Sequence, residues 1–375
     1  MFDRPKLLTP GPVEVPSAVL DRLSQHPIHH RTDQFESTFK RVQDQLKMLF
    51  QTKQNVAVFT ASGTGAMEAA VVNFFSTNEK VIVVESGKFG QRFSEIARIY
   101  GLNVISIEIP WGESLDTGTI KSFANQHPDA KGFFTQGCET STGALHEING
   151  LKKLLPPDCL LIVDAISSMG ASDLKMDQWG VDVVIAGSQK AFMMPTGLSF
   201  LAASELACKK AQSSDLPKFY FDFLKTIDAG LKNSTPFSSA VNLILALDQA
   251  LQLMLENGLD QFRDDIQNKA FTFRKALDFV GLKTLPSSPS PSLSVILVPE
   301  EVNGKALRQM AEDKYNITFM GGQEQLAGKI VRIGHLGAIN LQDLKSGFLA
   351  LCHCLKELGH PLDDEKVIQA ANLIN

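Results

Sequence analysis

The chain has 375 residues, of which 44% are hydrophobic, and its formal net charge is -5. This length and composition indicate an ordinary globular protein with an ample core, made of two or three domains or of one large domain with an appendage. The acidic balance, with no basic run longer than the Lys-Lys pairs at 152 and 209, argues against nucleic acid as the main partner.

The N-terminal sequence MFDRPKLLTPGP has charges and prolines where a secretory signal needs an uninterrupted apolar segment. No window reaches the roughly 18 apolar residues of a membrane span. We therefore expect a cytoplasmic protein with no membrane partner. The five cysteines show no CxxC spacing, so we expect neither a disulfide framework nor a metal site.

Seven short apolar runs between residues 56 and 203 predict strands. They are VAVFT, KVIVVE, NVISIEI, GFFTQ, CLLIVDA, VDVVIAG and LSFLAA. Segments between them, such as TGAMEAAVVNFF and GQRFSEIARIYG, have the 3.6-residue period of helices. This alternation predicts an α/β fold with a largely parallel sheet and helices on both faces. In such sheets ligands bind beyond the carboxyl ends of the strands.

The pattern changes after residue 238. Two long amphipathic helices are predicted at 239–258 and 259–281, and a domain boundary is expected along the second one. The Pro- and Ser-rich segment 286–292 is expected to be flexible. The strands LSVILV, ITFM and KIVRIG and two further helices after it predict a small α+β domain.

The first strand leads into Ser62, Gly63, Thr64 and Gly65, which open a helix. Small residues, free backbone N–H groups and the helix dipole make such a turn suitable for an anion, best of all a phosphate. An ordinary N-cap followed by glycines for a tight turn explains the same residues. No lysine follows the glycines, so this is not a Walker loop.

A carboxylate and a lysine follow two neighbouring predicted strands. Asp164 ends the run LLIVD, and Lys190 lies in the loop after VDVVIAG. Asp164 can simply cap the next turn, and Lys190 can be a solvated loop lysine. Both should nevertheless reach the same edge of the sheet, where burial would lower the pKa of the lysine and favour Schiff-base chemistry. Together with a phosphate site, they are the groups that pyridoxal phosphate requires.

Six motifs, in this order, resemble those of the class V, fold type I pyridoxal-phosphate aminotransferases. They are SGTGAMEAA, GKFGQR, ETSTG, VDAISSMG, GSQKAFMMPTGLSF and VRIGHLG. The resemblance runs from LLTPGP nearly to the C-terminus. It points to the group of serine- and alanine-glyoxylate (serine-pyruvate) aminotransferases, which includes cyanobacterial-type chains labelled soluble hydrogenase small subunit. No cysteine set suits a nickel or iron–sulfur centre, so hydrogenase activity is not expected.

The resemblance implies a role for individual residues. Lys190 would be the Schiff-base lysine and general acid/base, and Asp164 the partner of the pyridine nitrogen. Phe89 would stack on the cofactor ring, where some relatives have Trp, although a core Phe is an alternative. The other implied cofactor-binding residues are Ser62, Gly63, Thr64, Thr140, Thr142, Ile166 and Gln189, together with Thr235 and Ser238, which would reach the phosphate of a neighbouring subunit.

The substrate end of the site is implied by the same resemblance. Arg332 would bind the substrate carboxylate, for which a planar guanidinium is well suited, and a buried structural ion pair is the alternative. Gly11 lies in an N-terminal loop that would line the substrate pocket. His29 replaces a glycine that is common in the group, which leaves substrate identity open.

The resemblance implies a homodimer with shared active sites, and a chain divided into an N-terminal active-site segment (1–15), a large cofactor-binding domain (16–262) and a small domain (263–375). The expected activity is transfer of an amino group from serine or alanine to glyoxylate or pyruvate by a ping-pong mechanism. The alternatives are another class V reaction, such as cysteine desulfuration or a kynureninase-like cleavage, and a non-enzymatic subunit that binds a partner.

Overall fold

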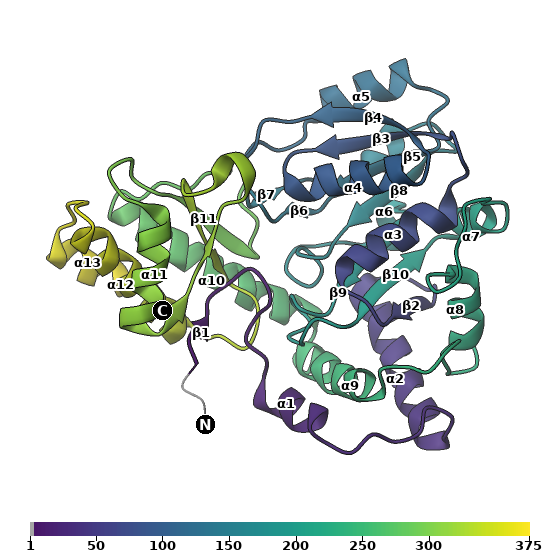
Figure 1. The fold of residues 1–375 in the computed structure, drawn as a ribbon, viewed down its shortest axis with the longest axis horizontal. Helices are drawn as coiled ribbons and strands as arrows, with labels where there is room; N and C mark the ends of the chain where they lie inside the picture. Colours follow the sequence, from purple (N-terminus) through teal and green to yellow (C-terminus); the bar gives the residue numbers. More distant parts are fainter. Residues whose placement is uncertain (1–3) are drawn as a thin grey trace.

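The computed structural model describes residues 4–375, and a seven-stranded sheet forms the centre of its larger part. The arrangement of its strands and helices is drawn in Figure 1. Across the sheet the strands are β2 (Val56–Phe59), β10 (Ser199–Ala203), β9 (Val183–Gly187), β8 (Leu160–Asp164), β5 (Gly132–Gln136), β3 (Lys80–Glu85) and β4 (Asn103–Glu108). Only β10 runs antiparallel to its neighbours, β2 and β9. All seven predicted strands and the mostly parallel sheet are therefore confirmed.

Helices cover both faces of this sheet, as predicted. Alternate residues of each strand enter different cores: Leu161 and Val163 of β8 join one hydrophobic cluster, and Leu160 and Ile162 join the other. The helices of this part are α1 (Ser17–Leu23), α2 (Asp33–Phe50), α3 (Gly63–Phe74), α4 (Lys88–Ile99), α5 (Thr117–Gln126), α6 (Met176–Trp179), α7 (Glu205–Ala211), α8 (Phe223–Gly230) and α9 (Val241–Leu255). Two buried faces are what a doubly covered sheet requires.

The C-terminal part is a smaller α+β unit, again as predicted (Figure 1). Its antiparallel sheet has the order β11 (Leu293–Leu297), β14 (Ile330–Gly334), β13 (Met320–Gly321). Its helices are α10 (Leu259–Phe279), α11 (Gly304–Tyr315), α12 (Leu341–Glu357) and α13 (Asp364–Ala371). The N-terminal strand β1 (Lys6–Leu7) pairs with β12 (Ile317–Thr318), so the start of the described chain packs against the smaller unit.

Three details differ from the sequence analysis. The single strand expected at ITFM is two short strands, because β12 pairs with β1 whereas β13 pairs with β14. Helix α13 was not predicted. The segment expected to be flexible at 286–292 is held by backbone hydrogen bonds, in which Ser287 N donates to Gly112 O and Ser290 N donates to Gly143 O, both at 2.9 Å.

Two short strands, β6 (Cys138–Glu139) and β7 (Ala144–Leu145), form a hairpin beyond the end of β5. The ETSTG motif makes the turn of this hairpin. Short 3-10 helices occur at Leu151–Leu154 and Glu324–Leu326. Within residues 4–375, no helix combines the length and the apolar character needed to cross a bilayer.

Candidate active site

A cavity of about 190 Å³ lies at the carboxyl edge of the central sheet, where β8 and β9 run side by side in parallel. Strand β8 ends at Asp164, and Lys190 follows the end of β9 by three residues. The residues lining the cavity are Gly11, Pro12, Ser62, Gly63, Thr64, Phe89, Arg92, Thr140, Asp164, Ile166, Ser167, Gln189, Lys190 and Thr196. The structure thus brings together most of the residues singled out from the sequence.

Lys190 is buried in the wall of this cavity, with 8% of its surface exposed. Its Nζ donates a hydrogen bond to the backbone carbonyl of Pro10 at 2.5 Å, and it forms no ion pair within residues 4–375. Burial lowers the pKa of this amine to about 8. Lys190 is therefore not the solvated loop lysine that its sequence also allowed, and its lowered pKa makes the neutral, nucleophilic amine easier to form than in an exposed lysine.

Gly11 and Lys190 are in close contact across the cavity. A β-carbon at position 11 would lie 2.7 Å from Nζ of Lys190, and the backbone of Gly11 has a φ of +133°, which other residues rarely adopt. The N-terminal loop therefore approaches the lysine closely only because residue 11 is glycine.

Asp164 is 4% exposed and has one backbone donor. Its Oδ1 accepts a hydrogen bond from Ile166 N at 2.9 Å, so it does cap the next turn, as the sequence allowed. We find no cation paired with it in the described chain, and burial raises the pKa of its carboxyl to about 7. A buried carboxylate in this state is stabilised by any ligand that brings a positive charge to its second oxygen.

The first turn of α3 faces the cavity with free donors. Ser62 is the N-cap residue, but its hydroxyl makes no capping hydrogen bond in the described structure. Ile166 lies so near that a β-carbon at Gly63 would be 2.5 Å from its Cδ1. The buried Oε1 of Gln189 has no partner in residues 4–375. The ordinary capping explanation therefore fails for Ser62. Gly65 N donates to Ser62 O at 2.9 Å, whereas the N–H groups of Gly63 and Thr64 remain available for an anion in the described structure.

Phe89 is half-buried at the start of α4 and lines the cavity. The guanidinium carbon of Arg92 lies 4.8 Å from its ring centroid, within cation–π range. Arg92 Nη1 also donates to Thr64 Oγ1 at 3.2 Å. Arg92 therefore adds positive charge beside the first turn of α3.

The two threonines of the ETSTG turn have different positions. Thr140 lines the cavity, and its Oγ1 shares a 2.6 Å hydrogen bond with Ser167 Oγ. Thr142 is fully buried and does not line the cavity, and its Oγ1 donates to Glu139 O within the turn, at 3.3 Å. Of the two, only Thr140 is placed to touch a ligand here.

Arg332 lies on β14 of the smaller unit, 5% exposed and just outside the cavity lining. Its Nε donates to Gly321 O at 2.9 Å and its Nη1 to Thr140 O at 3.1 Å. Burial lowers the pKa of this guanidinium to about 10. Among the residues that the structure describes, no carboxylate pairs with Arg332, so the alternative of a structural ion pair finds no support. A buried guanidinium held only by carbonyls is free to bind an anion.

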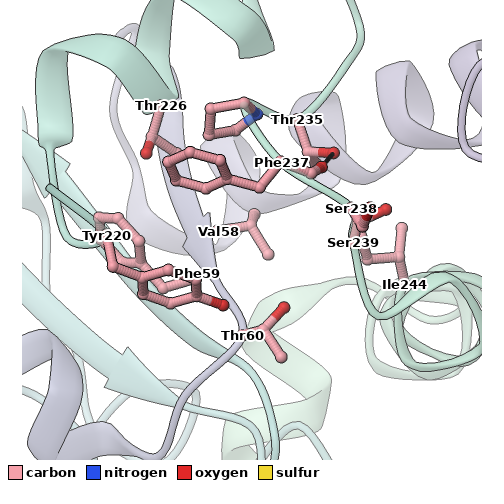
Figure 2. A pocket seen from close by; sticks show the side chains of 11 residues that line it. Val58, Phe59, Thr60, Tyr220, Thr226, Thr235, Phe237, Ser238, Ser239 and Ile244 are labelled. Carbon is pink, nitrogen blue, oxygen red and sulfur yellow. Dashed lines mark hydrogen bonds between the residues drawn. The ribbon is translucent and has the colours of Figure 1, made fainter.

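Thr235 and Ser238 are not brought to this cavity within one chain. Figure 2 shows them around a separate small pocket that also contains Val58, Phe59 and Thr60, and its lining shares no residue with that of the Lys190 cavity. Thr235 Oγ1 donates to Phe237 O at 2.9 Å. His29 is exposed and stacks on His30, also away from the cavity.

Sequence reasoning missed Arg92, Ser167, Thr196 and Pro12 as cavity residues. A signal existed for Arg92, which stands three residues after Phe89 in a predicted helix and therefore shares its face. Ser167 adjoined residues already singled out. Thr196 had no comparable signal.

A mostly parallel sheet with a buried lysine and aspartate at the ends of neighbouring strands defines a fold type I enzyme. The chain belongs to the class V aminotransferase family, whose model matches residues 7–333. The chain is 32% identical to a serine-glyoxylate aminotransferase of Hyphomicrobium methylovorum, and the alignment covers 95% of this chain and 90% of that protein. A solved alanine-glyoxylate aminotransferase from Nostoc sp. is 28% identical and superimposes with a TM-score of 0.91, covering 94% of this chain and 95% of that one.

A further relative carries a different name. A protein of Synechococcus sp. (strain PCC 6716) called soluble hydrogenase, small subunit, is 37% identical over 96% of this chain and 95% of its own length. In residues 4–375 of the present chain, no group of three or more His, Cys, Asp or Glu side chains is arranged to hold a metal ion. The five cysteines are free thiols, and four of them are buried.

Pyridoxal phosphate is the cofactor of class V aminotransferases and of this chain. The cavity fits it on three independent observations: the free donors at the start of α3 suit its phosphate, the unpaired carboxylate of Asp164 suits its pyridine nitrogen, and the buried amine of Lys190 suits its aldehyde. Gln189 Oε1 is a further buried polar atom that has no hydrogen-bond partner in the described structure and that a ligand could satisfy.

Proposed function

We propose that this aminotransferase moves an amino group from a small amino acid, serine or alanine, to glyoxylate or pyruvate by a ping-pong mechanism. The observation that carries the proposal is the meeting of Lys190, Asp164 and the first turn of α3 in one cavity, with the unpaired guanidinium of Arg332 beside it. The serine- and alanine-glyoxylate names of the relatives support this choice of substrates.

When bound, pyridoxal phosphate supplies an electron sink for the charge left on Cα after a proton is removed. Lys190 would hold the cofactor through its Nζ, and once freed this amine would act as the general base and acid that moves the proton of the substrate Cα. Asp164 would keep the pyridine nitrogen protonated by holding a negative charge beside it. Phe89 would stack on the ring, and Ser62, Gly63, Thr64 and Gln189 would contact the phosphate.

The substrate end depends on the smaller unit. Arg332 binds the substrate carboxylate in the two-pronged way that guanidinium geometry favours. Gly11 places the N-terminal loop against Lys190, where it would line the substrate pocket. Water then releases the keto acid, and the second half-reaction reverses these steps on glyoxylate or pyruvate.

The test is a screen of amino donors against glyoxylate and pyruvate, run on the wild type and on Arg332→Lys. Lysine keeps the positive charge and loses the two-pronged geometry, so we expect kcat/KM for amino acids to fall about ten- to a hundredfold, the equivalent of one hydrogen bond to a charged group. The visible spectrum of bound cofactor should be unchanged, because Arg332 lies outside the cofactor cavity.

Amines without a carboxylate are the control substrates, and their slow reaction should barely change in Arg332→Lys. An Arg332→Lys enzyme that is unaltered towards amino acids, or unable to bind cofactor, contradicts the proposed role. Release of sulfide from cysteine, or cleavage of kynurenine, in the absence of a keto acid would favour the alternative lyase reactions instead.

The proposed cytoplasmic enzyme is a homodimer, in which Thr235 and Ser238 contact the cofactor phosphate of the other subunit. Their remoteness from the Lys190 cavity of their own chain supports this arrangement. The exposed rings of Phe219 and Tyr220 beside the same pocket form an apolar surface suited to a second copy. The proposed division is a segment at 1–15, a large domain at 16–262 and a small domain at 263–375.

Shared sites predict complementation between two defective variants. We expect Lys190→Ala to be inactive alone and the double variant Thr235→Val with Ser238→Ala to be poorly active alone, whereas mixed dimers regain one intact site and with it a measurable part of wild-type activity. Sedimentation velocity of the holoprotein at micromolar concentration should show a dimer. A fully active monomer, or mixtures no more active than their parts, would refute the shared site.

A further inference from the structure

Helix α4, which carries Phe89 into the cavity, begins without a cap of its own. Its N-cap residue is Gly87, which has no side chain to bind the free N–H groups of the first turn. Those N–H groups are nevertheless occupied. Lys88 N donates to Ser141 Oγ at 3.0 Å, while Phe89 N and Gly90 N donate to Glu139 Oε2 at 3.1 and 3.0 Å. The cap therefore comes from the hairpin between β6 and β7.

Glu139 is completely buried, yet each of its partners is a hydrogen-bond donor. Besides Phe89 N and Gly90 N, its Oε1 accepts from Ser141 N at 3.1 Å and from Ser141 Oγ at 2.6 Å. Burial raises the pKa of this carboxyl, and the bonds from Ser141, Gly90 and Phe89 oppose the rise. Three of the four groups bonded to this carboxyl are backbone N–H groups, which can only donate, so the arrangement favours an ionised Glu139, stabilised by the positive end of the α4 dipole.

Two glycines let the hairpin and the sheet hold this helix start tightly. A β-carbon at Gly87 would lie 2.5 Å from Glu139 Cγ, and one at Gly90 would overlap the backbone carbonyl of Val84 on β3. The first turn of α4 is thus fixed between Glu139 on one side and the sheet on the other. Such packing leaves the backbone of Phe89 little freedom.

Glu139 also adjoins the substrate end of the site. The next residue, Thr140, lines the cavity, and its carbonyl accepts the hydrogen bond from Arg332. The charge of Glu139 raises the pKa of the Arg332 guanidinium against the effect of burial, without forming an ion pair that would compete with a substrate carboxylate. Glu139 is therefore connected to the cofactor end of the cavity through Phe89 and to the substrate end through Thr140.

We propose that Glu139 is a positioning residue for the reaction: it caps α4 from outside the helix and thereby holds Phe89 against the cofactor ring. The inference rests on the proposed function, because it assigns Phe89 the role of stacking on pyridoxal phosphate. Ser141 supports Glu139 in this role, because Ser141 Oγ accepts from Lys88 N and donates to the Glu139 carboxylate. Neither residue touches the cavity itself.

The test is a double-mutant cycle of Glu139→Gln and Phe89→Leu. The measured quantity is the dissociation constant of pyridoxal phosphate, obtained from visible absorbance well below the melting temperature. Loss of an aromatic stacking interaction corresponds to about a three- to tenfold weaker affinity. If Glu139 acts through Phe89, each single change should weaken binding by that factor and the two together by no more than about tenfold. Effects that multiply, or an unchanged affinity in Glu139→Gln, would overturn the inference.

Ser141→Ala paired with Phe89→Leu is the milder second cycle, and it applies if Glu139→Gln fails to fold. Asp182→Asn is the matched control. Asp182 is also a buried carboxylate, and it accepts Leu161 N at 2.9 Å, but it precedes β9 at the opposite edge of the sheet. Asp182→Asn should lower the melting temperature and leave the affinity for pyridoxal phosphate unchanged. Equal loss of affinity in the control would show a general stability effect and contradict a specific role for Glu139.

Hydrogen exchange in the cofactor-free protein separates this inference from the proposed function. The amides of Phe89 and Gly90 should exchange at least about tenfold faster in Glu139→Gln than in the wild type. In Asp182→Asn the same two amides should exchange at the wild-type rate. Unchanged exchange contradicts the external cap even if the enzyme is active. A wild-type protein that binds no pyridoxal phosphate contradicts the proposed function, whatever the exchange rates are.

Discussion

Lys190→Ala is expected to abolish both transamination and the visible absorbance of bound cofactor. The substitution removes the one lysine that lines the cavity among residues 4–375, and with it the amine that would bond covalently to the aldehyde of pyridoxal phosphate and move the Cα proton. The measurements are an absorbance spectrum after reconstitution and a transamination assay with serine or alanine and glyoxylate. Lys175→Ala is a suitable control, because that lysine pairs with Asp173 outside the cavity, and it should keep colour and activity.

The same lysine predicts a pH dependence for cofactor capture. Burial lowers the pKa of Lys190 to about 8, and only the unprotonated amine attacks an aldehyde. The rate at which cofactor-free protein turns yellow should therefore rise with pH through the region around 8 and level off above it. An active, yellow Lys190→Ala enzyme would show that another residue is the nucleophile.

Asp164→Asn is expected to keep the cofactor in place and lose most of the rate. The amide oxygen of asparagine can still accept the hydrogen bond from Ile166 N, so the turn after β8 should survive. A neutral amide cannot hold the pyridine nitrogen protonated, which removes the main electrostatic stabilisation of the transition state. We expect kcat to fall by about 10²- to 10³-fold, as for the loss of other preorganised electrostatic groups.

The decisive comparison for Asp164→Asn is between cofactor affinity, measured by absorbance titration, and turnover. Turnover near that of the wild type would mean that Asp164 serves only to cap its turn. If Asp164→Asn no longer binds cofactor, the carboxylate is needed for cofactor binding, and a separate role in catalysis is not supported.

Much of the fold could be predicted because its elements have strong local patterns. The seven apolar runs of the central sheet are short, regular and separated by periodic helices. The order of the strands and the antiparallel direction of β10 could not be predicted, because they depend on contacts between distant segments. ITFM was misjudged for the same reason: the chain changes pairing partner at Phe319, and no local pattern marks that position.

The site divides in a similar way. Asp164 and Lys190 could be predicted to meet, because both follow parallel strands and such strands end at one edge of the sheet. Arg332 could be assigned only from family motifs, since it comes from a separate sheet about 140 positions later in the chain. Glu139 went unrecognised within a quoted motif, because a helix cap supplied by a distant hairpin leaves no signal at the helix itself.

The way in which Arg332 is held has a consequence for protein engineering. Its two acceptors are main-chain carbonyls, those of Gly321 and Thr140, and a carbonyl stays in place when the side chain of its residue is exchanged. The orientation of the guanidinium should therefore change less when neighbouring side chains are mutated than it would if a carboxylate side chain held it. Libraries that seek new amino donors can randomise Pro12 and Thr196, which line the cavity. We expect the selected variants still to bind the α-carboxylate of the substrate, while their preference among substrate side chains changes.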